Sequence, residues 1–261
     1  RASFPNARIS WLVRPEFAPL LMHVDHVDDI VLFNRTFLSR WWRDPRAWRG
    51  LHRFLRELRE PKYDLVFDLQ GLFRSGLFAW ATRCPRRYGL RTAREGAWLF
   101  YTHLIEPGDT VHVLEQCLKL ASAAGADQRS LDAGLAVDPQ ALKTVQDMLA
   151  AHDLRPGGFV ALAVGSARRY KCWPLDRFAE LAHRIQNQFG LATAVVGSRG
   201  EMDMAEQLLE AARVPIVNLA GRTNLAELLA VLHSAALTVA NDTGPAYLAT
   251  ALNRPVVILF G

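Results

Sequence analysis

The segment Ala236–Gly261, ALTVANDTGPAYLATALNRPVVILFG, is typical of a strand, a turn, a short helix and a second strand. Its apolar run at 236–240 predicts a buried strand of a parallel sheet. The Asn-Asp-Thr sequence at 241–243 then supplies side-chain acceptors where a helix must begin, and Pro245 suits the first helical turn. Because free N–H groups and the positive end of the helix dipole meet at Gly244, this turn is suited to a diphosphate. An ordinary capped strand–helix–strand crossover has the same pattern.

The rest of the chain repeats this alternation. Apolar runs typical of strands lie at residues 9–13, 29–33, 65–69, 159–164, 192–196, 216–219, 237–240 and 256–260. Helical periodicity fills intervals at residues 47–59, 71–82, 111–124, 139–152, 175–189, 202–212, 225–235 and 245–252. Strands alternating with helices of this length predict an α/β protein whose parallel sheets are covered on both faces.

The alternation forms two series, with a natural boundary near residues 137–139. We expect two Rossmann-like domains, residues 1–137 and 138–261, with ligands in a cleft at the carboxyl ends of their strands. Residues 1–8 are typical of a helix end that leads into a strand, and the sequence stops directly after the strand at 256–260. We therefore expect both ends to be truncated, with a first strand upstream and a last helix downstream.

Composition restricts the class of protein. The 261 residues are 50% hydrophobic, no apolar run has the length of a membrane span, and no signal-peptide pattern opens the sequence. Cys84, Cys117 and Cys172 lie far apart and lack metal-ligand spacing. We expect a soluble cytoplasmic protein without a disulfide framework or a zinc site.

The net charge of +5 is unevenly distributed. Residues 1–110 hold 18 Lys and Arg against 12 Asp and Glu, whereas residues 111–261 hold 13 against 14. This asymmetry suggests an anionic partner for the first half, such as a phosphorylated sugar or a membrane surface, with a solvated basic face as the alternative. A nucleic acid is disfavoured, because no docking motif is present and the phosphate-type loops belong to the other half.

The loop after the strand at 159–164 has the sequence GSARRYKCWP and carries Gly165, Ser166 and Lys171. A lysine in such a loop places a compact positive charge beside a diphosphate. The loop is not a Walker motif, and a basic surface loop would have a similar composition.

The loop after the next strand, GSRGE at 197–201, ends in Glu201. A carboxylate at this position can accept hydrogen bonds from ribose hydroxyls, or it can cap the following helix. Because the carboxyl ends of parallel strands share one sheet edge, we expect this loop, the loop after residue 164 and the turn at 241–244 to lie together.

This combination of loops, followed by LATALNRPV at 248–256, resembles the ADP-heptose:lipopolysaccharide heptosyltransferases of glycosyltransferase family 9. In the first half, FPNARISWLV at 4–13, YDLVFDLQGLFRS at 63–75 and TARE at 92–95 are also similar to that family. The segment at 68–75 is nearer to the first heptosyltransferase of the inner core than to the second. The resemblance covers nearly the whole chain.

The resemblance implies a GT-B fold in which the C-terminal domain binds ADP-heptose and the N-terminal domain receives a lipid A–Kdo acceptor. It implies inverting transfer of heptose to the Kdo inner core, with no cofactor and no metal. On the donor side, the resemblance places the diphosphate against Ser166, Lys171, Thr243 and Gly244. It places the ribose against Glu201 and the nucleoside near Thr223, and Asp242 would orient the sugar or the loop. Arg74 and Arg94 are candidates for contacts with acceptor phosphate or carboxylate, with helix-surface charges as the alternative.

Two departures from the family pattern leave alternatives open. The resemblance assigns the general base to an Asp after the first strand, which we expect upstream of residue 1, so the catalytic residue is not identified. Tyr247 occupies a donor-side position where related sequences commonly carry His, and its larger ring changes the pocket. Another nucleotide sugar or acceptor, or a nucleotide-binding fragment without turnover, therefore remains an alternative. The location implied is cytoplasmic, with peripheral contact at the inner membrane left open.

Overall fold

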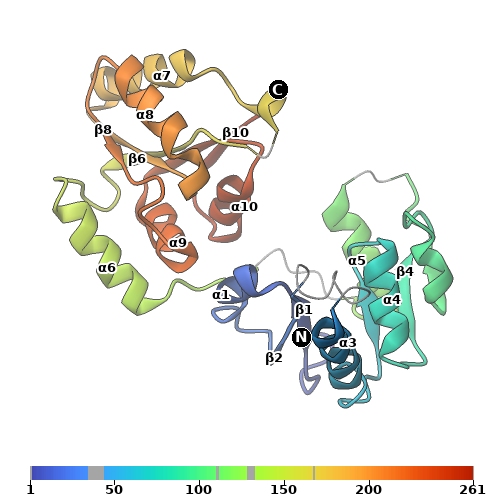
Figure 1. Cartoon of the computed structure of the whole chain (residues 1–261). Helices are drawn as coiled ribbons and strands as arrows, with labels where there is room; N and C mark the ends of the chain where they lie inside the picture. Colours follow the sequence, from blue (N-terminus) through green and yellow to red (C-terminus); the bar gives the residue numbers. More distant parts are fainter. Residues whose placement is uncertain (1, 35–43, 110–111, 128–132, 167, 261) are drawn as a thin grey trace. The chain divides into compact units, whose positions relative to one another are not determined.

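The computed structural model describes residues 2–34, 44–109, 112–127, 133–166 and 168–260 (Figure 1). The chain divides into two compact units, each described here by itself. Unit 1 comprises Arg1–Pro15 and Asp28–Leu131, and unit 2 comprises Glu16–Val27 and Asp132–Gly261.

This division differs from contiguous domains of residues 1–137 and 138–261 because residues 16–27 group with unit 2. Within that segment α1 (Ala18–Leu21) contacts α9 (Leu225–Ser234), and Val24 forms an antiparallel bridge with Leu135. The short α1 helix has too few residues to show helical periodicity in the sequence.

Unit 2 contains one parallel sheet of five strands. These are β6 (Phe159–Ala163), β7 (Ala192–Val196), β8 (Ile216–Asn218), β9 (Leu237–Asn241) and β10 (Val256–Leu259). They lie in the order β10-β9-β6-β7-β8, and all pairs are parallel. All five predicted strands of this half are confirmed, with ends that differ by at most one residue.

Helices cover both faces of this sheet (Figure 1). Alternate residues of β6 point to opposite faces, as the period of a strand requires. One face packs against α7 (Leu175–Phe189) and α8 (Met202–Ala211), through side chains such as Leu162 and Phe178. The other packs against α6 (Pro139–Ala150), α9 and α10 (Gly244–Ala251), through residues such as Phe159 and Val145.

The strand order reverses between β6 and β9. From β6 the chain continues outward through β7 and β8, and it then returns to place β9 on the other side of β6. The loops that follow β6 and β9 therefore diverge above neighbouring strands, which is where open α/β sheets bind ligands.

The described residues of unit 1 form two small parallel sheets. The strands β1 (Ser10–Val13) and β2 (Asp29–Leu32) form one, and β3 (Val66–Asp68), β4 (Arg87–Leu90) and β5 (His103–Ile105) form the other in the order β3-β4-β5. Its described α-helices include α3 (Pro45–Glu57), α4 (Phe73–Ala81) and α5 (Val113–Ala123). The predicted helix at 111–124 begins at a residue outside the described ranges.

The sequence did not predict β4 and β5. Both strands are short and carry polar residues, and Gly89 in the middle of β4 is unfavourable for a strand. The structure explains this glycine, because a Cβ at residue 89 would lie 2.1 Å from the ring of Tyr101. The tertiary contact thus determines a residue type that local strand propensity does not favour.

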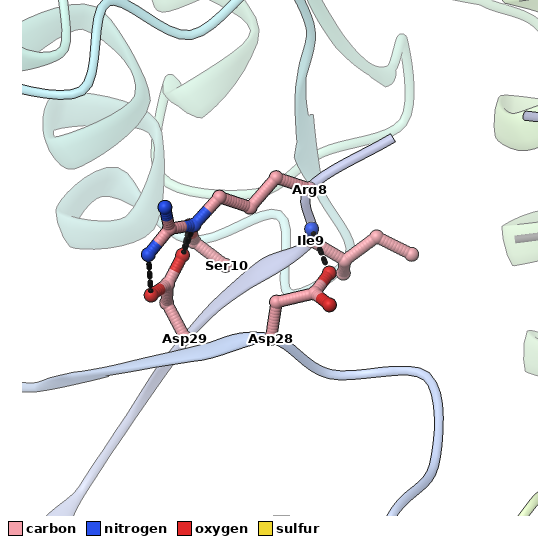
Figure 2. A network of polar contacts seen from close by, with 5 residues as sticks. All are labelled: Arg8, Ile9, Ser10, Asp28 and Asp29. Carbon is pink, nitrogen blue, oxygen red and sulfur yellow. Dashed lines mark hydrogen bonds and ion pairs between the residues drawn. The ribbon is translucent and has the colours of Figure 1, made fainter. Parts of the chain in front are cut away.

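An ion pair joins Arg8, two residues before β1, to Asp29, the first residue of β2 (Figure 2). The Arg8 guanidinium donates two hydrogen bonds to the Asp29 carboxylate, at 2.6 and 2.7 Å, and the Ile9 N–H donates to Asp28 at 2.7 Å. The bond from Arg8 lowers the pKa of Asp29, and the pKa of Arg8 is raised in turn. Because solvent screens this exposed pair, its contribution to stability is small.

Candidate anion-binding site

Three side chains link the loop after β6 to the first residues after β9. The ammonium group of Lys171 lies 2.5 Å from Asp242 Oδ2, and the Tyr247 hydroxyl donates to Asp242 Oδ1 at 2.6 Å. Lys171 ends the short helix η3 (Arg169–Lys171), whereas Tyr247 lies on α10. Each oxygen of one carboxylate therefore has its own donor, from a different element.

These contacts shift the pKa values of all three groups. The hydrogen bond to Asp242 raises the pKa of Lys171, and the hydrogen bonds from Lys171 and then Tyr247 lower the pKa of Asp242. The bond to Asp242 also raises the pKa of Tyr247. At neutral pH the site thus holds an ammonium, a carboxylate and a neutral phenol.

A buried asparagine holds the same two loops together. Asn241 is fully buried; its amide Nδ2 donates to the Val164 carbonyl at 2.6 Å, and its Oδ1 accepts from the Trp173 N–H at 2.9 Å. Both partners belong to the segment after β6. Because a buried polar group without partners is costly, this amide stabilises one arrangement of the loops.

The expectation that residues 241–243 cap α10 is wrong. Thr243 is the N-cap residue, but its side chain makes no capping hydrogen bond. The side chains of Asn241 and Asp242 instead bind groups of the β6 loop and Tyr247. The first turn of α10, which begins at Gly244, is therefore left without a side-chain cap and keeps the positive end of the helix dipole for another acceptor.

Glu201 joins the loop after β7 to the loop after β6. Its Oε2 accepts from the N–H and the hydroxyl of Ser198, at 2.6 and 2.7 Å, and forms the capping box of η4 (Arg199–Glu201). Its Oε1 lies against Gly165, where an added Cβ would approach it to 1.6 Å. Glu201 therefore closes the turn of η4, and as the N-cap residue of α8 (Met202–Ala211) it makes no side-chain cap on that helix. With Glu201 in this position, the space beside residue 165 fits only a glycine.

The loop after β8 lies beside the loop after β7, because the Gly221 N–H donates to the Gly197 carbonyl at 2.9 Å. Thr223 follows in that loop and is half-buried. The hydroxyl of Ser166 is 3.5 Å from the carbonyl of Asp242, at the limit of a hydrogen bond. Eight predicted donor-side residues therefore lie in the loops of one sheet edge or on α10: Ser166, Lys171, Glu201, Thr223, Asp242, Thr243, Gly244 and Tyr247.

In unit 1 a second buried network fixes the loop after β3. Asp68 is 6% exposed; its Oδ2 accepts from the Tyr101 hydroxyl at 2.6 Å, and its Oδ1 accepts from the N–H groups of Gln70 and Gly71 at 2.9 and 3.1 Å. Burial is the larger cause and the hydrogen bond to Asp68 the smaller one of a strongly raised pKa of Tyr101. The phenol therefore stays protonated and remains a donor.

Arg74 and Arg94 lie on segments that meet at this loop. Arg94 donates its backbone N–H to the Gly71 carbonyl at 2.8 Å, and its side chain is exposed. Arg74 lies on α4, with its guanidinium carbon 5.5 Å from the centre of the Phe33 ring. Both candidate acceptor-side residues thus belong to unit 1, whereas all the donor-side residues belong to unit 2.

The linking roles of Asn241 and Asp68 were not predicted from the sequence. Asn241 directly follows an apolar run and Asp68 interrupts one, and those positions were the available signal. Within the described ranges, no group of three or more His, Cys, Asp or Glu is placed to hold a metal ion. The absence of a cofactor thus stays a prediction.

Replacing Asn241 with Ala should destabilise unit 2, because the carbonyl of Val164 and the N–H of Trp173 would lose their buried partner. We expect a loss of about 1–3 kcal/mol in the free energy of unfolding, measured by urea denaturation. Gln188→Ala, which removes an exposed amide on α7, is the control. Equal stability of the two variants would contradict the linking role of Asn241.

Removing the phenol of Tyr247 should raise the pKa of Asp242 toward its ordinary value, and removing Lys171 should raise it further, because Lys171 is the larger cause. Carboxyl ¹³C NMR titrations of Tyr247→Phe and Lys171→Ala measure both shifts. In the native chain the ion pair should persist down to the lowered pKa of Asp242, below which protonation removes it. Tyr170→Phe is the control, and a larger shift in Tyr247→Phe than in Lys171→Ala would refute this ranking.

Comparison with known proteins supplies the family. The sequence model described as glycosyltransferase family 9 (heptosyltransferase) matches residues 51–261. Lipopolysaccharide heptosyltransferase 1 of Pseudomonas aeruginosa is 30% identical over 269 residues, which cover 99% of this chain and 71% of that protein. The lipopolysaccharide core heptosyltransferase OpsX of Haemophilus influenzae is 23% identical, over 98% of this chain and 71% of its own length.

Solved structures agree in fold. A family 9 glycosyltransferase from Veillonella parvula has a TM-score of 0.82 at 19% identity, over 97% of this chain and 72% of the other. Escherichia coli heptosyltransferase WaaC, solved with ADP, has a TM-score of 0.79 at 23% identity, over 98% and 79% of the two chains. The predicted GT-B type of α/β fold is therefore confirmed. With the match over residues 51–261, the chain belongs to glycosyltransferase family 9, the heptosyltransferase family.

Proposed function

We propose that this chain transfers heptose from ADP-heptose to the Kdo inner core of lipopolysaccharide. The observation that carries the proposal is the Lys171–Asp242 pair beside the uncapped first turn of α10, at the point where the strand order of the sheet reverses. Two E. coli WaaC structures of the same fold were solved with ADP and with ADP-2-deoxy-2-fluoro heptose, which supports an ADP-sugar as donor.

The residues of the site suit a diphosphate. A Cβ added at Gly244 would meet nothing within 4 Å, so the backbone there is open to a ligand. The ammonium of Lys171 is partly exposed and already lies beside α10. We infer that the donor diphosphate competes with Asp242 for Lys171 and accepts hydrogen bonds from backbone N–H groups at the start of α10. Glu201 and Thr223 would contact the nucleoside.

The proposed reaction is an inverting displacement. An acceptor hydroxyl attacks the anomeric carbon, the bond from that carbon to the diphosphate oxygen breaks, and ADP leaves from the opposite face. Lys171 and the N–H groups of α10 stabilise the negative charge that develops on the leaving diphosphate. This assignment uses no metal and no cofactor, and it leaves removal of the acceptor's proton to a general base that the described residues do not identify.

The proposed acceptor side is in unit 1. Arg74 and Arg94 flank the loop that Asp68 and Tyr101 hold, and guanidinium groups suit the carboxylate of a Kdo sugar or the phosphate of a lipid A. A rigid loop reduces the entropy lost when such an anion binds. We place the reaction at the cytoplasmic face of the inner membrane, where a lipid-linked acceptor would be accessible.

Tyr247 favours a second candidate, a family 9 transferase for another nucleotide sugar. Its phenol is bound to Asp242 and more than half exposed, so it occupies space beside the proposed diphosphate position. A panel of ADP- and UDP-linked sugars assayed for turnover separates the two candidates. Binding of ADP without turnover of any donor would instead favour a nucleotide-binding role for residues 1–261.

Replacing Lys171 with Ala should weaken ADP binding by about tenfold or more, because a charge-assisted bond to the diphosphate is lost. Isothermal titration calorimetry measures the affinity. Lys143→Ala, which removes an exposed ammonium on α6, is the control and should bind ADP like the native chain. Unchanged affinity in Lys171→Ala would place the diphosphate elsewhere, and failure of the native chain to bind ADP would count against the donor class.

A further inference from the structure

Four large apolar side chains are exposed together on unit 1, where α4 meets the short helix η2 (Ala97–Phe100). Phe73 and Trp80 of α4 are 48% and 54% exposed, and Trp98 and Leu99 of η2 are 45% and 67% exposed. We call these four residues the apolar patch. Single exposed apolar residues are common, whereas a cluster of this kind marks an interaction surface.

The two helices that carry the patch, α4 and η2, are in close contact at Gly76. A Cβ at that residue would lie 2.8 Å from the Phe100 ring and 3.0 Å from the Ala97 carbonyl oxygen. Phe73 and Trp80 lie about one turn before and after Gly76, on the same face of α4. The ring of Phe73 also lies 5.3 Å from that of Phe100, edge to face.

Basic residues border the patch. Arg83 donates its backbone N–H to the Trp80 carbonyl at 3.1 Å, and the Arg94 carbonyl accepts from the Ala97 N–H at 3.0 Å; both side chains are exposed. The nearby carboxylate of Glu95 accepts from the Phe73 N–H, at the start of α4. The surrounding part of the chain, residues 1–110, also carries the excess of positive charge.

This combination matches the chemistry of a membrane surface. Tryptophan favours the headgroup level of a bilayer because its ring is apolar and its N–H is polar, and arginine binds lipid phosphates. Anionic lipids add a negative potential that attracts a basic unit. Among the described residues, no helix is long and apolar enough to cross a membrane.

We propose that the apolar patch docks unit 1 on a bilayer that contains anionic lipids. The side chains of Trp80, Trp98 and Leu99 enter the headgroup region, and the side chain of Arg83 contacts lipid phosphates. Docking depends on exposed groups and charge alone. It can therefore hold or fail independently of the proposed transfer reaction, and it is measured without turnover.

Co-sedimentation with vesicles tests the proposal on the whole chain. Native protein should sediment with phosphatidylcholine vesicles that contain phosphatidylglycerol, and much less with phosphatidylcholine alone. The double variant Trp80→Ser, Leu99→Ser should lower the apparent affinity by about tenfold or more. Arg83→Glu should also weaken binding and leaves the apolar side chains in place, which keeps the test valid if the double variant does not fold. Phe189→Ser, a control on α7 at a residue 69% exposed, should bind like the native chain.

Four results would overturn the proposal. Native protein could fail to bind anionic vesicles, could bind phosphatidylcholine equally well, or could lose as much binding through Phe189→Ser as through the patch substitutions. Light scattering supplies the fourth result, because a native dimer that becomes monomeric in the double variant would assign the patch to a contact between copies of this chain. Melting by circular dichroism checks that each variant is folded.

Discussion

The buried amide of Asn241 is the contact on which the arrangement of the candidate site depends. It bonds both to the carbonyl of Val164, directly after β6, and to the backbone N–H of Trp173, and so closes the β6 loop onto the end of β9. Because these two strands are neighbours at the reversal of strand order, any ligand bound there contacts both loops. The position of Lys171 beside Asp242 follows from that closure.

The surrounding side chains have two roles in the same geometry. Glu201 caps η4 and also lies against Gly165, while Asp242 neutralises Lys171 and accepts from Tyr247. These contacts hold the loops in one arrangement before any ligand arrives, so less conformational entropy is lost on binding. A bound diphosphate would then replace Asp242 as the anionic partner of Lys171.

Much of unit 2 could be predicted from the sequence, because its strands are apolar on both faces and its helices have strong periodicity. The sheet of β6 to β10 and the gathering of Lys171, Glu201 and Asp242 at one edge follow from that pattern. In unit 1, β4 and β5 could not be predicted. Gly89 disfavours a strand by local propensity, and it is present in β4 because the ring of Tyr101 leaves no room for a Cβ there. The partners of Asn241 were also beyond prediction, because they lie far away in the sequence.

The most direct test of this account is a structure of the chain with ADP bound. We predict that one phosphate oxygen lies about 3 Å from the ammonium of Lys171. A second phosphate oxygen should accept a hydrogen bond from a backbone N–H at the start of α10. The loops of β6 and β9 should remain joined through Asn241. A diphosphate bound elsewhere, with Lys171 still paired only to Asp242, would contradict the account.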